Sequence, residues 1–234
     1  MFQHLQSTLG KKYVMAVSGI LLFGFVIVHM LGNLQIFLGK ESLNTYAAFL
    51  KSKPAVLWGF RIGLLAVAVV HITSAIQLSH ENKKARPVGY ATHRPIGSSY
   101  ASRTMLMSGL IVFVFIVYHL LHFTVALPGA NLLPKSTEMP NASFLELHDA
   151  QGRHDVFRMV VLGYSNGWVS GFYILGMALL CLHLSHGVGS MFQSLGLRNE
   201  RTGALMDWVA RAAAAIIFVG NSSIPIAILL GYGK

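Results

Sequence analysis

Five long apolar stretches run through this sequence, and they limit the chain to a helical membrane fold. They cover approximately residues 14–38, 56–78, 105–127, 168–191 and 210–230, and each is near the ~20 residues that a helix needs to cross the bilayer core. Because lipid offers no hydrogen-bonding partner, the backbone of such segments must form helices or a closed barrel. We therefore expect an all-α membrane protein with five transmembrane helices, in a single integral membrane domain over residues 1–234.

The charged residues agree with a membrane protein and argue against two other functions. They make up 11% of the chain, whereas about a quarter of the residues in a soluble domain are charged. Every acidic residue falls between or at the edges of the five stretches, which argues against a carboxylate-driven transporter. The formal net charge of +10 suits contact with the lipid bilayer surface or an acidic partner. No basic segment interleaved with aromatic residues indicates nucleic-acid binding.

Lysine and arginine residues also suggest an orientation. Lys11 and Lys12 precede the first stretch, and a dense basic cluster lies between the second and third stretches. The members of that cluster are Lys83, Lys84, Arg86, Arg94 and Arg103. Since cytoplasmic loops carry an excess of such residues, we predict a multi-pass protein with a cytoplasmic amino terminus.

The first four stretches each carry a histidine at a similar depth, namely His29, His71, His119 and His183. Successive spans run in opposite directions, so His29 and His119 should lie near one face of the membrane and the other two near the opposite face. In an up-down bundle of the first four helices, the two histidines of each pair lie on diagonal helices and face each other across the core. Ionisable residues inside a span usually mark a functional site, and each pair could clamp one haem iron.

Two further histidines keep the ligand assignment open. His122 and His186 follow His119 and His183 by three residues, on nearly the same helical face. Either could compete as a ligand, or could hydrogen-bond a haem propionate or a quinone carbonyl. Any single histidine could also have a structural role and hydrogen-bond a neighbouring helix. For the whole chain, the alternative functions are a proton transporter with a histidine relay and another membrane b-type cytochrome.

The cysteine content narrows the kind of haem. Cys181 is the only cysteine of the sequence, so neither a disulfide framework nor a cysteine-ligated iron–sulfur cluster can form within the chain. The Cys-x-x-Cys-His attachment motif of c-type haem is absent. A haem would therefore be b-type, held by axial histidines.

Small residues and loops carry weaker signals. Small residues flank the histidines and either leave room for a macrocycle or serve ordinary helix packing. They are Ser18, Gly19, Gly24, Gly32, Gly109, Gly187 and Gly189. Segment 39–54 is equally compatible with a short interfacial helix, anchored by Tyr46 and Phe49, and with a plain connector. Segment 128–167 should be partly helical. His148 and His154 in it are expected to be exposed loop histidines rather than metal ligands.

Four strings around the histidines resemble a known family. They are VHMLGN around His29, VVHITSAI around His71, VYHLLHF around His119, and GFYILGMALLCLHLSHGVGSMFQSLG around His183. Together with the order of the spans, they resemble the five-helix, di-haem cytochrome b subunit of succinate:quinone oxidoreductases, over essentially the whole chain. The resemblance implies that His29 with His119, and His71 with His183, are the axial ligands of two b-type haems.

The same resemblance implies partners and a location. A flavoprotein subunit with FAD would interconvert succinate and fumarate, and an iron–sulfur subunit would dock on the cytoplasmic face of a bacterial inner membrane. This chain would be the non-catalytic anchor that passes electrons to a quinone, commonly menaquinone. From their polarity near a haem level, the quinone contacts are expected among Tyr46, Lys51, Arg61, His122 and His186. Cys181 stands two residues before His183, where some members place a carboxylate, so no proton path is assigned.

Overall fold

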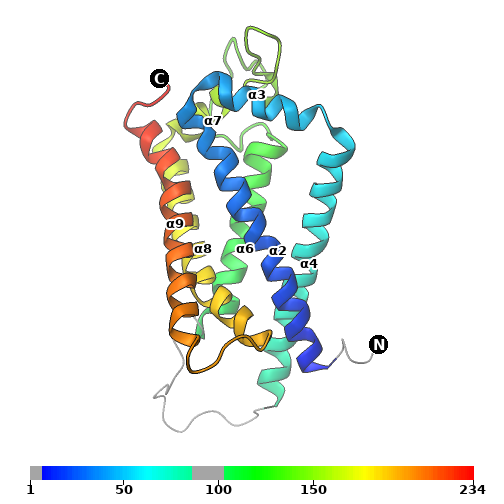
Figure 1. Ribbon diagram of the computed structural model, residues 1–234. Helices are drawn as coiled ribbons and strands as arrows, with labels where there is room; N and C mark the ends of the chain where they lie inside the picture. Colours follow the sequence, from blue (N-terminus) through cyan, green and yellow to red (C-terminus); the bar gives the residue numbers. More distant parts are fainter. Residues whose placement is uncertain (1–6, 86–102) are drawn as a thin grey trace. The chain divides into compact units, whose positions relative to one another are not determined.

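The structure is a computed structural model that describes residues 7–85 and 103–234. It is 77% helical, and the described residues contain no strand. Figure 1 shows the helices coloured along the sequence. The all-α fold class predicted from the sequence is thereby confirmed.

Five of the described helices are long and apolar enough to cross a membrane. They are α2 (Thr8–Leu34), α4 (Pro54–Lys84), α6 (Met105–His119), α8 (Gly167–Ser194) and α9 (Gly203–Leu229). A 3-10 turn, η1 (Gln35–Leu38), extends α2, and a π-helical turn, η2 (Leu120–Thr124), extends α6. The chain is a multi-pass membrane protein with the five spans that were predicted.

The helices extend beyond several predicted boundaries, because their polar ends continue the backbone ladder. Thus α2 begins before the predicted residue 14, and α4 continues past residue 78. At these ends Lys11 pairs with Glu81. Thr8 also donates a hydrogen bond to Glu81, at 3.3 Å. Hydropathy alone cannot locate such ends, since polar residues can follow an apolar span without breaking the helix.

Within residues 7–85 and 103–234, three short helices lie between the spans: α3 (Lys40–Lys51), η3 (Phe144–Glu146) and α7 (Val156–Ser165). Segment 39–54 is thus mostly a helix and not a plain connector. Gly39, with φ of 101°, makes the sharp entry to α3, a conformation that favours glycine. Pro54 opens α4, where a missing N–H costs nothing.

By its contacts the chain divides into two compact units, and each of the five spanning helices contributes residues to both. Unit 1 consists of Met1–Val26, Phe60–Leu110 and Leu180–Ala215; unit 2 consists of Ile27–Gly59, Ile111–Leu179 and Ile216–Lys234. His71 and His183 belong to unit 1, and His29 and His119 to unit 2. Each predicted pair therefore lies within one unit.

In unit 2, a buried amide ties α3 to the start of α7. Asn44 on α3 donates to Asp155 Oδ1 at 3.0 Å and accepts from the Phe157 N–H at 2.9 Å. Asp155 also caps α7 by accepting from the Arg158 N–H, at 3.0 Å, and pairs with Lys40 at 2.7 Å. Buried polar groups with all partners in place hold such contacts in one geometry.

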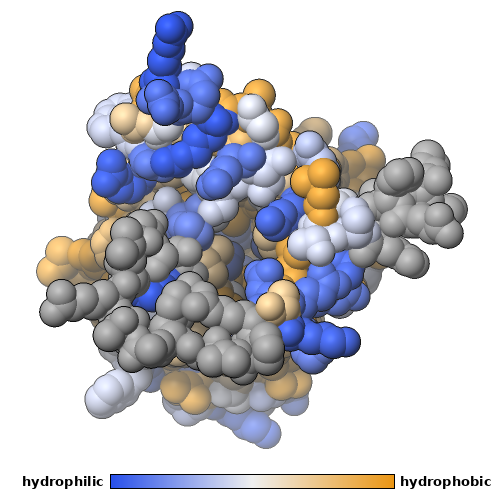
Figure 2. Space-filling model, turned by 90° about the horizontal axis from the view of Figure 1, so that it is seen from below, coloured by the Kyte–Doolittle hydropathy of each residue, from blue (hydrophilic) through white to orange (hydrophobic). Residues whose placement is uncertain are grey.

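In unit 1, one end of the molecule is hydrophilic. Figure 2 views the side at which α2 begins, and hydrophilic side chains gather over the described part of that face. The exposed basic residues of unit 1 include Lys12, Lys83, Lys84, Arg103, Arg198 and Arg201. Arg86 and Arg94 of the predicted basic cluster lie outside the described residues.

Candidate functional site

His71 of unit 1 is held by a serine on another helix. The Ser18 hydroxyl on α2 lies 3.0 Å from His71 Nδ1 on α4. Its single proton is directed to the backbone carbonyls of Val14, at 2.8 Å, and Met15, at 3.1 Å. Donation to either carbonyl leaves Ser18 Oγ as an acceptor toward the histidine, an arrangement that would put the imidazole proton on Nδ1 and the lone pair on Nε2.

His183 of unit 1 is held in the same way. The Ser108 hydroxyl on α6 lies 3.2 Å from His183 Nδ1 and donates to the Met105 carbonyl at 3.1 Å. Donation to that carbonyl would likewise leave Ser108 Oγ to accept from His183 Nδ1–H, with the lone pair of His183 on Nε2. The two rings are near enough to interact electrostatically.

Glycines let these two rings approach the facing helices. An added Cβ at Gly19 would lie 3.4 Å from His71 Cε1, and an added Cβ at Gly109 would lie 3.4 Å from His183 Cε1. Each glycine directly follows the serine that holds the same histidine. Helices α2 and α6 therefore present the same Ser-Gly pair to a histidine of the next spanning helix.

His29 and His119 form the pair in unit 2. Their ring centres are 5.8 Å apart and their planes meet at 83°. Two metal–imidazole bonds of about 2.0 Å across one ion would separate the ring centres by roughly 6 Å. Phe115 stacks on His119 at 6.2 Å, and Gly176 makes this possible, because an added Cβ there would lie 2.5 Å from the Phe115 ring.

Of the two competing histidines, His122 lies in unit 2 and is buried with 1% of its surface exposed. Its Nδ1 is 2.9 Å from the Tyr173 hydroxyl, and its Nε2 has no hydrogen-bond partner among the described residues. His186 lies in unit 1, where its Nε2 is 2.9 Å from the Ser190 hydroxyl of the same helix. Among the four proposed ligands, His71, His119 and His183 are half-buried residues and His29 is an exposed one.

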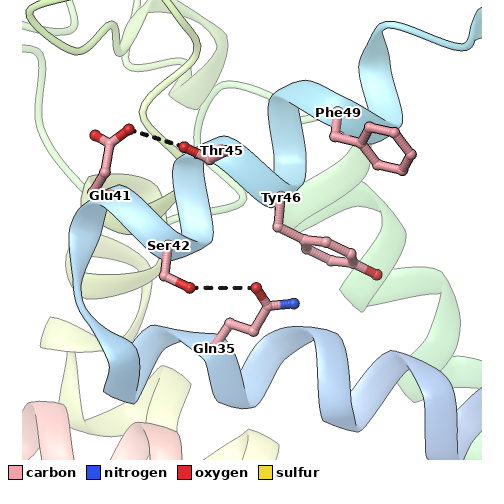
Figure 3. A pocket seen from close by; sticks show the side chains of 6 residues that line it. All are labelled: Gln35, Glu41, Ser42, Thr45, Tyr46 and Phe49. Atoms are coloured by element: carbon pink, nitrogen blue, oxygen red, sulfur yellow. Dashed lines mark hydrogen bonds between the residues drawn. The ribbon is translucent and has the colours of Figure 1, made fainter.

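Of the expected quinone contacts, Tyr46 lines a groove of unit 2. The groove has a volume of about 500 Å³ and is lined by Gln35, Glu41, Ser42, Thr45, Tyr46 and Phe49. Figure 3 shows Gln35 and Tyr46 side by side in it. The Tyr46 ring lies against Gly32, where an added Cβ would be 3.0 Å from its Cε1. Gly32 in turn follows His29 by three residues.

Lys51 and Arg61 do not join that groove. Lys51 Nζ donates to His154 Nδ1 at 2.9 Å, while Arg61 belongs to unit 1. His154 Nε2 lies 3.0 Å from the Phe144 carbonyl. Burial lowers the pKa of His154 and the Lys51 ammonium lowers it further, so this loop histidine is neutral at physiological pH. It is half-buried rather than exposed.

The donor set fits a haem better than a bare metal ion. Within the described residues, no three or more His, Cys, Asp or Glu side chains are placed to hold an ion directly. Two neutral imidazoles per pair leave the other coordination positions to be filled by a non-protein group, as a porphyrin does. The hydrogen bonds on Nδ1 of His71 and His183 are those that orient a ligating histidine.

Searches against models of protein families, against curated proteins and against solved structures find no match for this chain. The functional argument therefore depends on the residues and their geometry.

Ser108 and Tyr173 are two residues of these sites that the sequence interpretation missed. A signal for Ser108 was present: the Ser-Gly pairs at 18–19 and 108–109 both begin 11 residues before the histidine of their own helix. Eleven residues are close to three helical turns, so serine and histidine share a face. Tyr173 had no comparable signal.

Proposed function

We propose that this chain is the di-haem cytochrome b membrane-anchor subunit of a succinate:quinone oxidoreductase. The observation that carries the proposal is the pair His71 and His183, whose Nδ1 atoms lie 3.0 and 3.2 Å from serine hydroxyls that can accept a hydrogen bond from them. This arrangement leaves each Nε2 as a lone-pair donor, as an axial haem ligand requires. The likeness of the strings around the four histidines to that family supplies the name of the complex.

The chain's own residues would bind, orient and isolate the cofactors. His29 with His119 and His71 with His183 would each hold one b-type haem, and apolar spans would keep water from the irons. Neutral imidazole ligands, their hydrogen bonds and their burial would set the two potentials. Each bound haem would supply reversible one-electron transfer, and no bond to carbon would be made or broken in this subunit.

A quinone is the proposed electron partner within the membrane. The groove beside Tyr46 has a volume in the range of small-molecule sites. It combines the apolar side chain of Phe49 with the Gln35 amide and the Tyr46 hydroxyl, the kind of lining that binds a ring with carbonyl oxygens. We therefore favour Tyr46 among the expected contacts for menaquinone or another quinone. The other expected contacts, Lys51, Arg61, His122 and His186, rank below it.

The remaining partners are proposed from the family likeness and the charge. A flavoprotein carrying FAD would perform the dicarboxylate chemistry, and an iron–sulfur subunit would deliver or receive the electrons. The exposed basic residues of unit 1 support docking of such a subunit on that face (Figure 2). On this proposal the protein resides in a bacterial cytoplasmic membrane with its amino terminus in the cytoplasm.

Single histidine substitutions test the proposal. His71→Leu or His183→Leu should remove the haem of that pair and leave the other haem in place, because each pair lies in its own unit. His29→Leu or His119→Leu should do the reverse. Haem content and redox titration of the purified complex provide the readout, and loss of both haems from every single change would contradict two independent sites.

A further inference from the structure

One hydroxyl group connects a proposed haem ligand to the competing histidine. Tyr173 on α8 lies with its oxygen 2.9 Å from His122 Nδ1 and 3.4 Å from His119 Nδ1. All three residues belong to unit 2. Tyr173 is 4% exposed and His122 is 1% exposed, so neither exchanges this contact for water.

The number of protons on this hydroxyl restricts the two histidines. A phenol has one proton to donate, and each neutral imidazole has one N–H and one lone pair. If Tyr173 donates to His122 Nδ1, it accepts from His119 Nδ1–H, and the lone pair of His119 is on Nε2. If Tyr173 instead donates to His119 Nδ1 and accepts from His122 Nδ1–H, Nε2 of His119 is protonated and the lone pair is on His122 Nε2. When Tyr173 donates in one of these two hydrogen bonds and accepts in the other, only one of the two histidines offers an Nε2 lone pair to a metal.

The surroundings of the two rings decide between these arrangements. The His119 ring is half-buried and 5.8 Å from that of His29. The His122 ring is enclosed by three aromatic rings with centres 4.0 to 5.5 Å away, those of Tyr118, Phe123 and Phe144. An added Cβ at Gly163 would lie 3.3 Å from His122 Cε1. A macrocycle has access to His119 and none to His122.

We propose that Tyr173 is a positioning residue that selects His119 over His122 as the haem ligand. Its hydroxyl oxygen accepts a hydrogen bond from His119 Nδ1–H, and its hydroxyl group donates a hydrogen bond to His122 Nδ1. His122 is then left with its own proton on the buried Nε2. The inference depends on the proposed function, because it assigns a role toward a haem at the His29/His119 pair.

Redox titration of the purified complex with Tyr173→Phe tests this role. Loss of the hydroxyl removes the acceptor from His119 Nδ1–H and makes the ligand less electron-donating, so the potential of the haem at this pair should rise. The potential of the haem at His71 and His183 should not change. Tyr118→Phe is the matched control, because Tyr118 packs on His122 at 5.4 Å but donates its hydroxyl to the Ala130 carbonyl at 3.0 Å.

An unchanged potential of the haem at His29/His119 in Tyr173→Phe, or an equal rise in Tyr118→Phe, would overturn the inference. If these variants still bind two haems, the proposed function is unaffected by that result. A wild-type complex without haem would overturn both. His122→Leu gives a second test that does not need the tyrosine variant to fold. Retention of the haem at His29/His119 supports selection of His119, and its loss would show that His122 is the ligand.

Discussion

Removal of the Ser108 hydroxyl tests how the histidines are held. In Ser108→Ala, His183 Nδ1–H loses the oxygen that lies 3.2 Å away. Within the described residues, no other hydrogen bond to this nitrogen replaces it. The ring is then free to rotate or to change tautomer, and a protonated Nε2 cannot bind iron.

The size of the effect follows from the cost of a lost partner. A buried N–H without an acceptor costs about 1–3 kcal/mol, and loss of a partner that orients a ligating histidine typically costs about 10- to 100-fold in metal affinity. We expect a loss in this range for the haem at His71/His183. Ser18→Ala should lower the affinity for the same haem by a comparable factor, because the Ser18 hydroxyl lies 3.0 Å from His71 Nδ1.

The assay is transfer of haem from the purified protein to an excess of an apo haem acceptor, followed by optical spectroscopy. Ser185→Ala is the matched control, since Ser185 follows His183 by two residues and its hydroxyl donates to the Leu182 carbonyl at 2.8 Å. Haem retention in Ser108→Ala equal to that in Ser185→Ala would refute the reasoning. So would haem retention in Ser18→Ala equal to that in Ser185→Ala.

Three other predictions concern packing, pH and spectroscopy. Gly109→Leu should displace the His183 ring, because an added Cβ at Gly109 would lie 3.4 Å from His183 Cε1. Haem quantification should then show loss of the haem at His71/His183 alone. Gly63→Leu is the control, because an added Cβ there would have nothing within 4 Å. Asp155→Ala should cost about 1 kcal/mol of stability through the lost helix cap. Burial raises the pKa of Asp155, but its hydrogen bonds more than offset this and the net pKa is lowered. The Asp155 carboxylate therefore stabilises the fold at neutral pH, and this stabilisation is lost as pH falls below ~4. Equal destabilisation by Asp155→Ala in thermal unfolding at pH 3 and at pH 7 would contradict this. With planes at 83°, the ferric haem at His29/His119 should give a strongly anisotropic low-spin electron paramagnetic resonance signal, and a signal typical of parallel rings would count against that geometry.

The spans could be predicted because they depend on quantities that are local in sequence. Hydropathy over about 20 residues identifies a membrane helix, and depth within alternating spans sorts His29 with His119. The ends of the helices depend on polar contacts between spans, such as that of Lys11 with Glu81, which no hydropathy window contains. The predicted boundaries differ there for this reason.

Contacts that depend on the rotation of a helix about its axis were beyond the sequence. Tyr173 reaches both His119 and His122 only because α8 turns this side chain toward η2 and the end of α6. Segment 39–54 stayed undecided because a 12-residue helix is too short to be identified by periodicity when it is half polar. Its Asn44, which joins α3 to Asp155, is instead the residue that holds it in place.

The measurement that tests the central claim most directly is the haem content of the purified chain. Dithionite-reduced minus oxidised optical spectra, with pyridine haemochrome quantification, should show two b-type haems per polypeptide. No haem in protein produced under haem-replete conditions would contradict the account, and the alternative of a histidine relay for protons would then stand in its place.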